Sequence, residues 1–332
     1  MPAGPADIAA AANRLKNGGI VAFPTETVYG LGADALSERA VARVFELKGR
    51  PSNNPLIVHV TSPAMARQVV APGAWTQEAD RLAAAFWPGP LSIVLPKASA
   101  VPGNVTGNGP SVAVRCPDHP VTLALLKAFG GPLVGPSANP SGRVSPTTAA
   151  HVREAFSQAD VLVLDGGPCR AGIESTVISL VGSPRILRPG VIGPDELSLV
   201  IDRDVAPPQT SATAHSPASP LESPGTLNSH YAPAAKTILA ETAAIPDVLR
   251  RSSGPAVVMT WSGLVPPAPH AAIRIAPHAA GYAASLYSAL RQADSTHPSL
   301  IIVERPPLDG DARSRAIWTA IMDRLSRASA AQ

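Results

Sequence analysis

The sequence of 332 residues contains few of the residues that hold structural metals or form disulfides. Its two cysteines, Cys116 and Cys169, belong to no C-x-x-C pair and to no Cys/His array with zinc-ligand spacing. We therefore expect neither structural zinc nor a disulfide framework. The N-terminus lacks a basic segment followed by a long apolar one, and no stretch approaches ~18 uninterrupted apolar residues. These absences predict a cytoplasmic protein without membrane association.

The common nucleotide-binding and hydrolase motifs are missing as well. There is no G-x-x-x-x-G-K-[ST], no G-x-G-x-x-G between a strand and a helix, no H-E-x-x-H and no G-x-S-x-G. A standard P-loop or Rossmann dinucleotide site in the first domain is therefore not expected, nor is a zinc protease or a serine hydrolase. The net charge of +3 is compatible with RNA or nucleotide binding, but no Lys/Arg-rich run is present.

The composition that is present indicates a globular, soluble protein of two domains. Hydrophobic residues make up 45% of the chain and charged residues 15%, which is enough apolar material for well-packed cores. The length exceeds that of one typical domain of roughly 100–200 residues. Between 203 and 235 the sequence is crowded with Pro, Ser, Thr and Ala and has little apolar periodicity. We predict a catalytic domain over 1–202, a linker over 203–235 and a second domain over 236–332.

Helix and strand patterns alternate in the first domain. Ser37 is a candidate N-cap, helical spacing follows it, and Gly49 ends the helix. Other expected helices cover 7–17, 76–86, 119–129 and 146–156, and expected strands cover 20–23, 56–60, 91–95, 112–115, 133–135, 161–164, 175–180 and 185–187. This mixture predicts an α/β fold with a twisted, largely mixed sheet.

The second domain repeats the alternation on a smaller scale. Strands are expected at 237–240, 256–261, 273–275 and 300–303, and helices at 244–251, 282–293 and 314–326. Strands that alternate with helices are typical of parallel sheets, so a smaller, Rossmann-like α/β domain is predicted.

Polar residues follow the first expected strand, in the segment PTETVYGLG at 24–32. Thr27 and its neighbours would stand at the carboxyl end of that strand, where open α/β sheets bind ligands. A polar turn that caps the next element is an equally good interpretation.

Cations stand at the ends of several expected elements. Lys48 and Arg50 leave a helix, while Arg115 and Arg188 end strands. Guanidinium forks and ammonium groups in such places suit phosphate or carboxylate oxygens. Lys48 would equally interact with the carbonyls at the end of its own helix. The partner of Arg115 would be either a structural or a substrate carboxylate.

Other candidate residues give weaker signals. His59 lies in an apolar strand and, taken alone, is more typical of a core histidine than of a ligand group. The segment GPSANPSGRVSPTT at 135–148 ends in Ser145 followed by proline, which predicts an N-cap and a helix start that would suit phosphate. An ordinary loop would explain that segment too. Glu174 and Ser175 stand at the entrance of a strand.

Taken together, these segments resemble the YrdC/Sua5 family. The order and spacing agree over about 190 residues for PTETVYGLG, KGRPSNNPLIVHV, SVAVRCP, GPSANPSGRVSPT, ESTV and LRPG. The segment SPGTLNSHYAP at 223–233 and the α/β unit after it resemble the long, Sua5-type form of the family. The resemblance therefore spans nearly the whole chain.

The resemblance implies an ATP-dependent reaction that joins L-threonine and bicarbonate as threonylcarbamoyl-adenylate and releases pyrophosphate. The product would support N6-threonylcarbamoyladenosine formation at adenosine 37 of tRNAs that read ANN codons. Motif positions assign the threonine side to Thr27, His59, Arg115, Gly135 and Ser175. They assign ATP to Arg50, Asn54, Ser111, Ser137, Ser145, Arg188 and Tyr231, with Lys48 and Arg50 as the catalytic cations. Ser111 replaces a threonine expected from the family pattern but keeps the hydroxyl group.

The implied chemistry requires alignment of two anions and neutralisation of phosphate charge more than it requires a strong base. Mg²⁺ is expected to arrive with the ATP phosphates. The product would pass to the tRNA threonylcarbamoyl-transferase machinery, direct tRNA binding would be weak, and the protein is expected to be a monomer.

Two other functions were weighed against this one. A carbamoyl transferase of the hydrogenase-maturation type would need zinc fingers that two cysteines cannot build. An RNA-binding module would bind RNA in a salt-sensitive way without turning over ATP. The linker offers a further prediction: an aromatic residue such as Tyr231 has no use in a free tether, so 223–233 is expected to fold over the nucleotide site as a lid.

Overall fold

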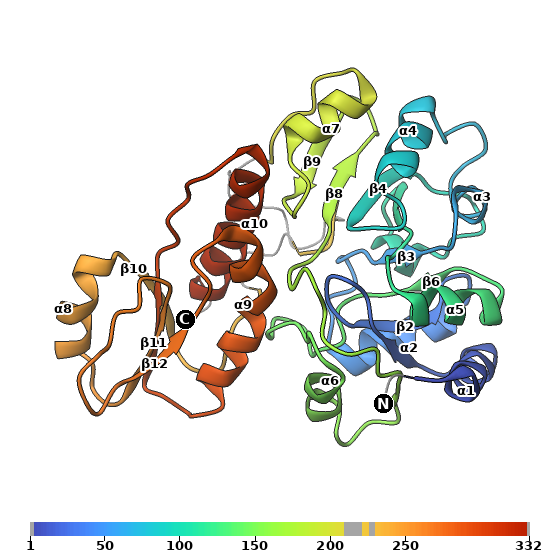
Figure 1. Cartoon of the computed structure of the whole chain (residues 1–332). Coiled ribbons are helices and arrows are strands. Elements are labelled where there is room, and N and C mark those ends of the chain that lie inside the picture. Colours follow the sequence, from blue (N-terminus) through green and yellow to red (C-terminus); the bar gives the residue numbers. More distant parts are fainter. Residues whose placement is uncertain (1–2, 209–220, 226–229, 331–332) are drawn as a thin grey trace.

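The computed structural model describes residues 3–208, 221–225 and 230–330. Its helices and strands form two lobes, each built on one sheet (Figure 1). The larger sheet has nine strands in the order β7-β1-β2-β6-β3-β5-β4-β8-β9, and the smaller sheet has four in the order β10-β13-β11-β12. Among the described residues, no helix has the length and apolar character needed to cross a membrane.

The elements of the larger lobe occupy the first 201 residues. They are α1 (Pro5–Lys16), β1 (Val21–Phe23), β2 (Gly30–Asp34), α2 (Glu38–Lys48), β3 (Ile57–His59), α3 (Pro63–Ala66), α4 (Gln77–Phe86), β4 (Leu91–Pro96), η1 (Gly103–Thr106), β5 (Ser111–Arg115), α5 (Pro120–Phe129), β6 (Leu133–Val134), α6 (Ala149–Ala155), β7 (Leu162–Val163), β8 (Thr176–Ser179), β9 (Arg185–Arg188) and α7 (Pro194–Ile201). Parallel pairs join β1 to β7, β3 to β5 and β4 to β8, and the other pairs are antiparallel. The mixed sheet expected from the sequence is confirmed.

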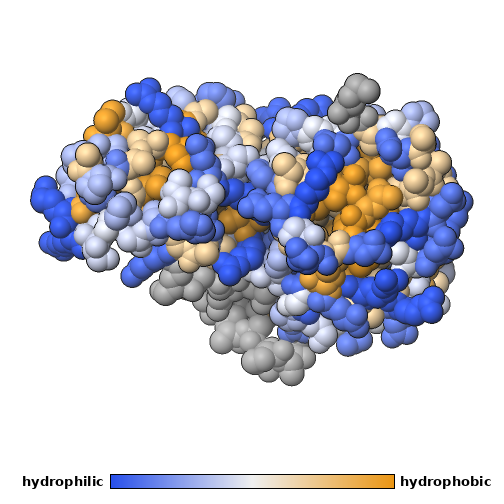
Figure 2. Space-filling view, turned by 90° about the horizontal axis from the view of Figure 1, so that it is seen from below, coloured by the Kyte–Doolittle hydropathy of each residue, from blue (hydrophilic) through white to orange (hydrophobic). Residues whose placement is uncertain are grey.

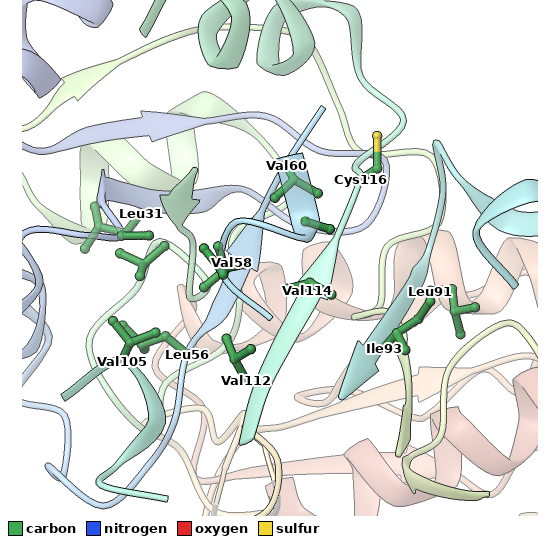
Figure 3. Close-up of a cluster of buried hydrophobic side chains, with 14 of the residues drawn as sticks. Leu31, Leu56, Val58, Val60, Leu91, Ile93, Val105, Val112, Val114 and Cys116 are labelled. Carbon is green, nitrogen blue, oxygen red and sulfur yellow. The ribbon is translucent and has the colours of Figure 1, made fainter. Parts of the chain in front are cut away.

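One face of the central strands carries the main core of the larger lobe. Alternate residues of β3, β5 and β4, such as Val58, Val114 and Ile93, are fully buried there. Figure 3 shows them gathered on the same side as Leu31 of β2 and Val105 of η1. Because side chains alternate between the two faces of a strand, Ile57, His59, Ala113 and Arg115 must face the other side.

Local signals explain where α2 begins and ends. The Ser37 hydroxyl accepts a hydrogen bond from the backbone N–H of Ala40, and Gly49 adopts a left-handed conformation with φ 58°. Both features match the expected N-cap and C-cap. The expected helix at 146–156 is shorter than predicted, because its N-cap is Thr148 and its first residue is Ala149. Ser145 is therefore not an N-cap, which corrects the prediction.

Strand β2 was not expected, because the sequence around it resembles a turn. Gly30 and Gly32 lie directly over the ring of Phe23 in β1, and a Cβ atom at either position would stand 2.7–2.8 Å from that ring. The glycines are required by this close approach and do not mark a turn. Helix α7 was also missed, although Gly193 and Pro194 form a recognisable helix start.

The smaller lobe is a parallel α/β unit, as expected. Its elements are β10 (Thr237–Ala240), η2 (Thr242–Ala244), α8 (Ile245–Arg250), β11 (Ala256–Thr260), β12 (Ala271–Arg274), α9 (Ala279–Asp294), β13 (Leu300–Glu304) and α10 (Ala312–Ser329). All three strand pairs are parallel. Strand β12 begins two residues earlier than predicted, and as an edge strand it is largely exposed.

Helices α9 and α10 lie on the side of the smaller sheet that faces the larger lobe (Figure 1). Seen from below in Figure 2, the two lobes stand side by side, and apolar residues gather on the larger one within a mostly hydrophilic surface. The two helices therefore make the contact between the lobes, and their polar residues are close to the pocket described next.

Candidate active site

A pocket with about 490 Å³ of open volume lies on the face of the large sheet opposite the core of Figure 3. Its walls come from the larger lobe and from the chain that joins the two lobes, at Pro224, Gly225, His230 and Tyr231. Eight predicted site residues line it together: Thr27, Arg50, His59, Arg115, Gly135, Ser137, Arg188 and Tyr231. The structure thus brings together segments that are far apart in the sequence.

His59 and Arg115 occupy neighbouring positions on the pocket floor. They are direct partners in the parallel pair of β3 and β5, and both are almost fully buried. Burial, followed by the positive charge of Arg115, lowers the pKa of His59 to about 3, so the ring is neutral at ordinary pH. Its edge packs on Phe23, with ring centroids 5.4 Å apart. Gly135 closes this wall, because a Cβ atom there would lie 2.7 Å from the His59 ring.

Arg115 has an internal carboxylate partner. Its Nη2 lies 2.6 Å from Oε1 of Glu26, and both side chains are about 95% buried. The Nε of Arg115 also donates to the carbonyl of Gly89, while Glu26 accepts from the backbone N–H of Asp118. The sequence allowed either a structural or a substrate carboxylate as the partner of Arg115, and the structure shows the structural one. Glu26 itself was not among the predicted site residues, although it lies in the PTET segment.

Thr27 is oriented by a local hydroxyl network. The Thr25 Oγ1 accepts from the backbone N–H groups of Thr27 and Val28 and lies 2.8 Å from Thr27 Oγ1. Such a hydroxyl turn holds the segment in one conformation. The fully buried Thr27 therefore presents a fixed hydroxyl to the pocket.

Arg188 connects the sheet to the chain that covers the pocket. Its Nε and Nη2 donate to the carbonyl of Ser175, Nη2 also donates to the Ser175 hydroxyl, and Nη1 donates to the carbonyl of Pro224. Burial lowers the pKa of Arg188. Ser175 therefore lies behind the pocket wall, where it also contacts the hydroxyl of Ser92 at 2.9 Å.

Arg50 and Asn54 form one unit. The Arg50 guanidinium donates to the carbonyl and the side-chain oxygen of Asn54 and to the carbonyl of Pro55. Burial lowers the pKa of Arg50 to about 9, which still leaves it charged at neutral pH. Arg50 is half-buried and folds back to hold its own loop.

Lys48 lies behind the pocket wall and does not contact the end of its helix. Its ammonium group donates to the carbonyls of Ser137 and Asn139 at 2.6 and 2.5 Å. Burial lowers its pKa well below the usual value, with a further contribution from the charge of Arg50. Lys48 therefore fixes the loop that carries Ser137. It is not among the residues that line the pocket.

Glu174 is a buried carboxylate at the contact between the lobes. It accepts from the hydroxyl of Ser145, from the hydroxyl of Tyr287 in α9 and from Nε of Arg324 in α10. Although burial raises the pKa of Glu174, the charges of Arg324 and Arg188 and the Ser145 hydrogen bond hold it at about 2. The predicted ATP ligand Ser145 is thus engaged with Glu174. Sequence reasoning missed Tyr287 and Arg324, because nothing marks them within their amphipathic helices.

Tyr231 packs between the two lobes and lines the pocket. It is 1% exposed, its φ is 63°, and its ring is stacked on Tyr287 with centroids 5.6 Å apart. The guanidinium of Arg324 lies over the same ring at 5.4 Å. His230 meets Tyr231 edge to face, and burial lowers the pKa of His230 to about 3. Gly225 is held close to the Tyr231 hydroxyl, since a Cβ atom there would lie 2.6 Å from it.

Ser111 is the predicted residue that lies farthest from this group. It lines a second pocket with about 610 Å³ of open volume, whose walls include Val94, Ala113, Leu187 and Leu221. Pro55 belongs to this second pocket, and Arg50, which bonds to Pro55, belongs to the first. The two pockets are therefore neighbours on one face of the sheet.

The acidic residues near the first pocket are already paired. Glu26 pairs with Arg115 and Glu174 pairs with Arg324. Within the described ranges, no group of three or more His, Cys, Asp or Glu side chains could hold a metal.

Comparisons with known proteins agree with this architecture. The family described as "Telomere recombination" matches residues 13–190, and the family described as "Threonylcarbamoyl-AMP synthase, C-terminal domain" matches residues 192–330. The second match begins before the linker, whose central part is outside the described residues. The threonylcarbamoyl-AMP synthase of Pyrococcus abyssi is 38% identical and covers 96% of this chain and 93% of its own length. The threonylcarbamoyl-AMP synthase of Bacillus subtilis is 37% identical, and the match covers 97% of this chain and 92% of that protein.

Solved structures extend the likeness to the arrangement of the whole chain. P. abyssi Sua5 in complex with L-threonine is 37% identical and superposes with a TM-score of 0.85, covering 97% of this chain and 94% of that one. An alanine-substituted variant of the same protein gives a TM-score of 0.86 at 36% identity. With both domains matched over almost their full length, this chain belongs to the Sua5-type threonylcarbamoyl-AMP synthases.

Proposed function

We propose that this chain uses ATP to convert L-threonine and bicarbonate into threonylcarbamoyl-adenylate, with release of pyrophosphate, at the pocket formed by its larger lobe and the chain that joins the lobes. Its family is that of the threonylcarbamoyl-AMP synthases, which support the threonylcarbamoyladenosine modification of tRNA. The use of bicarbonate, the release of pyrophosphate and the roles of single residues are our proposal. We further propose that it acts as a monomer and passes its product to the tRNA threonylcarbamoyl-transferase machinery.

The observation that carries this proposal is the charge balance of the pocket. The half-buried Arg50 and the buried Arg188 both line it, and both donate hydrogen bonds to neutral groups, which belong to Asn54, Pro55, Ser175 and Pro224. Buried cations are costly unless an anion balances them. A triphosphate supplies that anion, and planar guanidiniums match its oxygens well. We therefore assign the phosphates to Arg50 and Arg188.

The threonine side of the site is assigned to the pocket floor. Arg115 would hold the threonine carboxylate while it remains paired with Glu26. The Thr27 hydroxyl, the backbone at Gly135 and the neutral ring of His59 would surround the amino acid. Ser175 would act from behind, through Arg188. The P. abyssi protein has been crystallised with L-threonine, which supports an amino-acid site in this fold.

The second pocket suits the base of ATP. Its apolar walls offer a flat ring favourable contacts, and Ser111 adds a hydroxyl group at the end of β5. Asn54 and Ser137 would stand between base and phosphates. Ser145 does not contact ATP directly in this proposal. It acts through Glu174, which accepts a hydrogen bond from the Ser145 hydroxyl.

The reaction follows from positioning. The threonine amine first adds to CO2 and loses a proton, which gives a carbamate; from bicarbonate the same carbamate forms with loss of water. A carbamate oxygen then attacks the α-phosphorus of ATP, the bond to the bridging oxygen breaks, and pyrophosphate leaves. His59 remains neutral, so we assign it to orientation and not to proton storage. Orientation of this kind can supply ~7–11 kcal/mol of a barrier.

Mg²⁺ would be held by the ATP phosphates. When bound, it would neutralise charge on the phosphate oxygens. The chain's own contribution is Lys48, which fixes the loop at 137–139 and so places Ser137 beside the phosphates.

The domain division proposed here is a catalytic domain at 1–202, a lid-forming linker at 203–235 and a C-terminal domain at 236–332. Residues 209–220 and 226–229 of the linker lie outside the described residues. The described part supports the lid, because Pro224, Gly225, His230 and Tyr231 line the pocket. Figure 1 shows the larger and smaller lobes that the linker connects.

The decisive experiment measures pyrophosphate release with threonine or bicarbonate left out in turn. Release should require both substrates. The Arg50→Ala variant should lose this activity, because one of the two phosphate cations is gone, while the matched Arg43→Ala variant on the outer surface of α2 should keep it. RNA binding without substrate-dependent pyrophosphate release would instead favour an RNA-binding module.

The lid has its own test. Residues 223–233 are replaced by a Gly/Ser segment of equal length, and ATP affinity and adenylate retention are measured. We expect weaker ATP binding and faster loss of the adenylate. Values equal to those of the unmodified protein would mean that the segment is only a tether.

A further inference from the structure

Two side chains of the C-terminal domain reach the wall of the proposed ATP site. Arg324 of α10 is 0% exposed and donates to Glu174 at 3.0 Å and to the neighbouring Asp323 at 2.8 Å. Tyr287 of α9 donates to the same Glu174 oxygen at 2.8 Å. Both also contact Tyr231, Tyr287 by stacking and Arg324 through its guanidinium. One carboxylate and one lid aromatic are therefore held by the same pair of residues.

Glu174 poses an electrostatic problem for the site. It lines the pocket, is 6% exposed and carries its negative charge, yet the ligands proposed for that pocket are a polyphosphate and a carboxylate. Charges in a buried site are weakly screened, so an uncompensated carboxylate would repel both ligands. The Ser145 and Tyr287 hydroxyls satisfy its oxygens but cannot cancel the charge.

Arg324 is the cation in direct contact with Glu174. Their ion pair has side-chain exposures of 0% and 8%, so it is desolvated on both sides. Arg188 also influences the pKa of Glu174, but it donates its hydrogen bonds to Ser175 and Pro224. The charge of Glu174 is therefore balanced chiefly from the other lobe, across 150 positions of sequence.

We propose that Arg324 is a positioning residue supplied by the C-terminal domain: its guanidinium neutralises Glu174 at the pocket wall and supports the ring of Tyr231 beside it. The docked C-terminal domain thereby becomes a requirement for tight ATP binding. This rests on the proposed function, since it takes the pocket to be the ATP site. Arg324 touches neither substrate in this scheme and acts through Glu174 and Tyr231.

The test compares charge removal with charge restoration. The variants are Arg324→Met, which keeps an apolar side chain near the Tyr231 ring, Glu174→Gln, and the double variant Glu174→Gln with Arg324→Met. Arg315→Met is the matched control, because Arg315 lies on the same helix, is exposed and bonds to the carbonyl of Gly310. Each is assayed for the dissociation constant of ATP, the KM for both substrates, kcat and thermal unfolding.

Arg324→Met should weaken ATP binding about tenfold or more, which is the effect of roughly 1.4 kcal/mol of unbalanced charge. The double variant should bind ATP within about threefold of the unmodified protein, because the negative charge is removed together with its partner. Arg315→Met should leave ATP affinity unchanged. If Arg324→Met lowers thermal stability while ATP affinity stays the same, or if the double variant fails to recover affinity, Arg324 only holds the lobes together.

Arg324→Lys keeps the proposal testable should Arg324→Met fail to fold. A lysine retains the charge without the planar fork, so ATP affinity should stay within about threefold. A loss with lysine as large as that with methionine would overturn the role of charge. The two assays test the inference and the proposed function separately. If pyrophosphate release by the unmodified protein does not need threonine, the proposed function fails. The ATP dissociation constants of the variants, measured by direct titration, still test the role of Arg324 in that case.

Discussion

Gly172 packs directly against helix α9 of the smaller lobe, and its substitution tests how the lobes dock. Gly172 adopts φ 72° and lies so close to α9 that a Cβ atom there would stand 2.3 Å from the carbonyl oxygen of Ala283 and 2.5 Å from Cα of Ala284. These are backbone atoms, which cannot rotate away. Gly172 also precedes Glu174 by two residues, so any retreat of α9 would disturb the Tyr287 contact to that carboxylate.

The loss of folding free energy expected for Gly172→Ala has two contributions. A left-handed conformation costs an alanine about 1–2 kcal/mol. Optimal carbon contacts are ~3.5–4 Å, so the methyl group must push α9 back by roughly 1 Å, and overpacking of this kind costs about 1–3 kcal/mol. We therefore expect roughly 2–5 kcal/mol of destabilisation in total, concentrated at the contact between the lobes.

Gly167 provides the matched control. Its φ is 80°, but nothing lies within 4 Å of a Cβ atom built on it. Gly167→Ala should therefore cost only the conformational part, about 1–2 kcal/mol. Urea unfolding measures both variants, calorimetry shows whether the lobes unfold separately, and ATP titration reports on the site. Equal losses in the two variants, with unchanged ATP affinity in both, would refute the idea that α9 docks tightly at Gly172.

Three further predictions follow from buried charges. Arg115→Met should destabilise the protein by about 3–5 kcal/mol in urea unfolding, since Glu26 is left buried and unpaired, and Glu26→Gln in addition should recover much of the loss. Lys48→Met should lower the unfolding free energy by at least ~1–3 kcal/mol, because two carbonyls lose their donor; unchanged stability would remove its structural role. His59 and His230 have pKa values lowered from 6.5 to about 3, so the unfolded chain binds more protons between those pH values and stability must fall as the pH falls from 6.5 towards 3. Each contributes a slope of up to ~1.4 kcal/mol per pH unit, and His59→Gln should flatten the measured slope between pH 4.5 and 6.5.

The sequence was sufficient where the signal was local. The cap residues Ser37 and Gly49, the alternating strands around Val58 and Val114 and the strand-helix alternation of the smaller lobe were all predicted and observed. The sequence was insufficient where a residue is required by a contact with another strand. The glycines of β2 looked like a turn, because the ring of Phe23 that requires them belongs to another strand.

The site shows the same division between local and distant causes. Motif order predicted eight residues that line one pocket, and strand alternation explains why His59 and Arg115 face it. The partners that neutralise charge were not predictable in this way. Arg324 is one of four arginines in the final helix, and its contact to Glu174 depends on how the two lobes dock. Even Ser145, whose position suggests an N-cap, is explained by that carboxylate.

The charges at the pocket are balanced by residues of both lobes. Each carboxylate at the pocket has its own guanidinium, Arg115 for Glu26 and Arg324 for Glu174, so neither pair leaves a net charge. What remains is the half-buried Arg50 and the buried Arg188, two cations whose hydrogen bonds go to neutral oxygens. Such cations weaken the folded state until an anion arrives, and binding of a polyphosphate recovers that free energy. In the proposed scheme, Glu174 would cancel part of this attraction if left alone, so the C-terminal domain that supplies Arg324 would set how strongly the pocket attracts ATP.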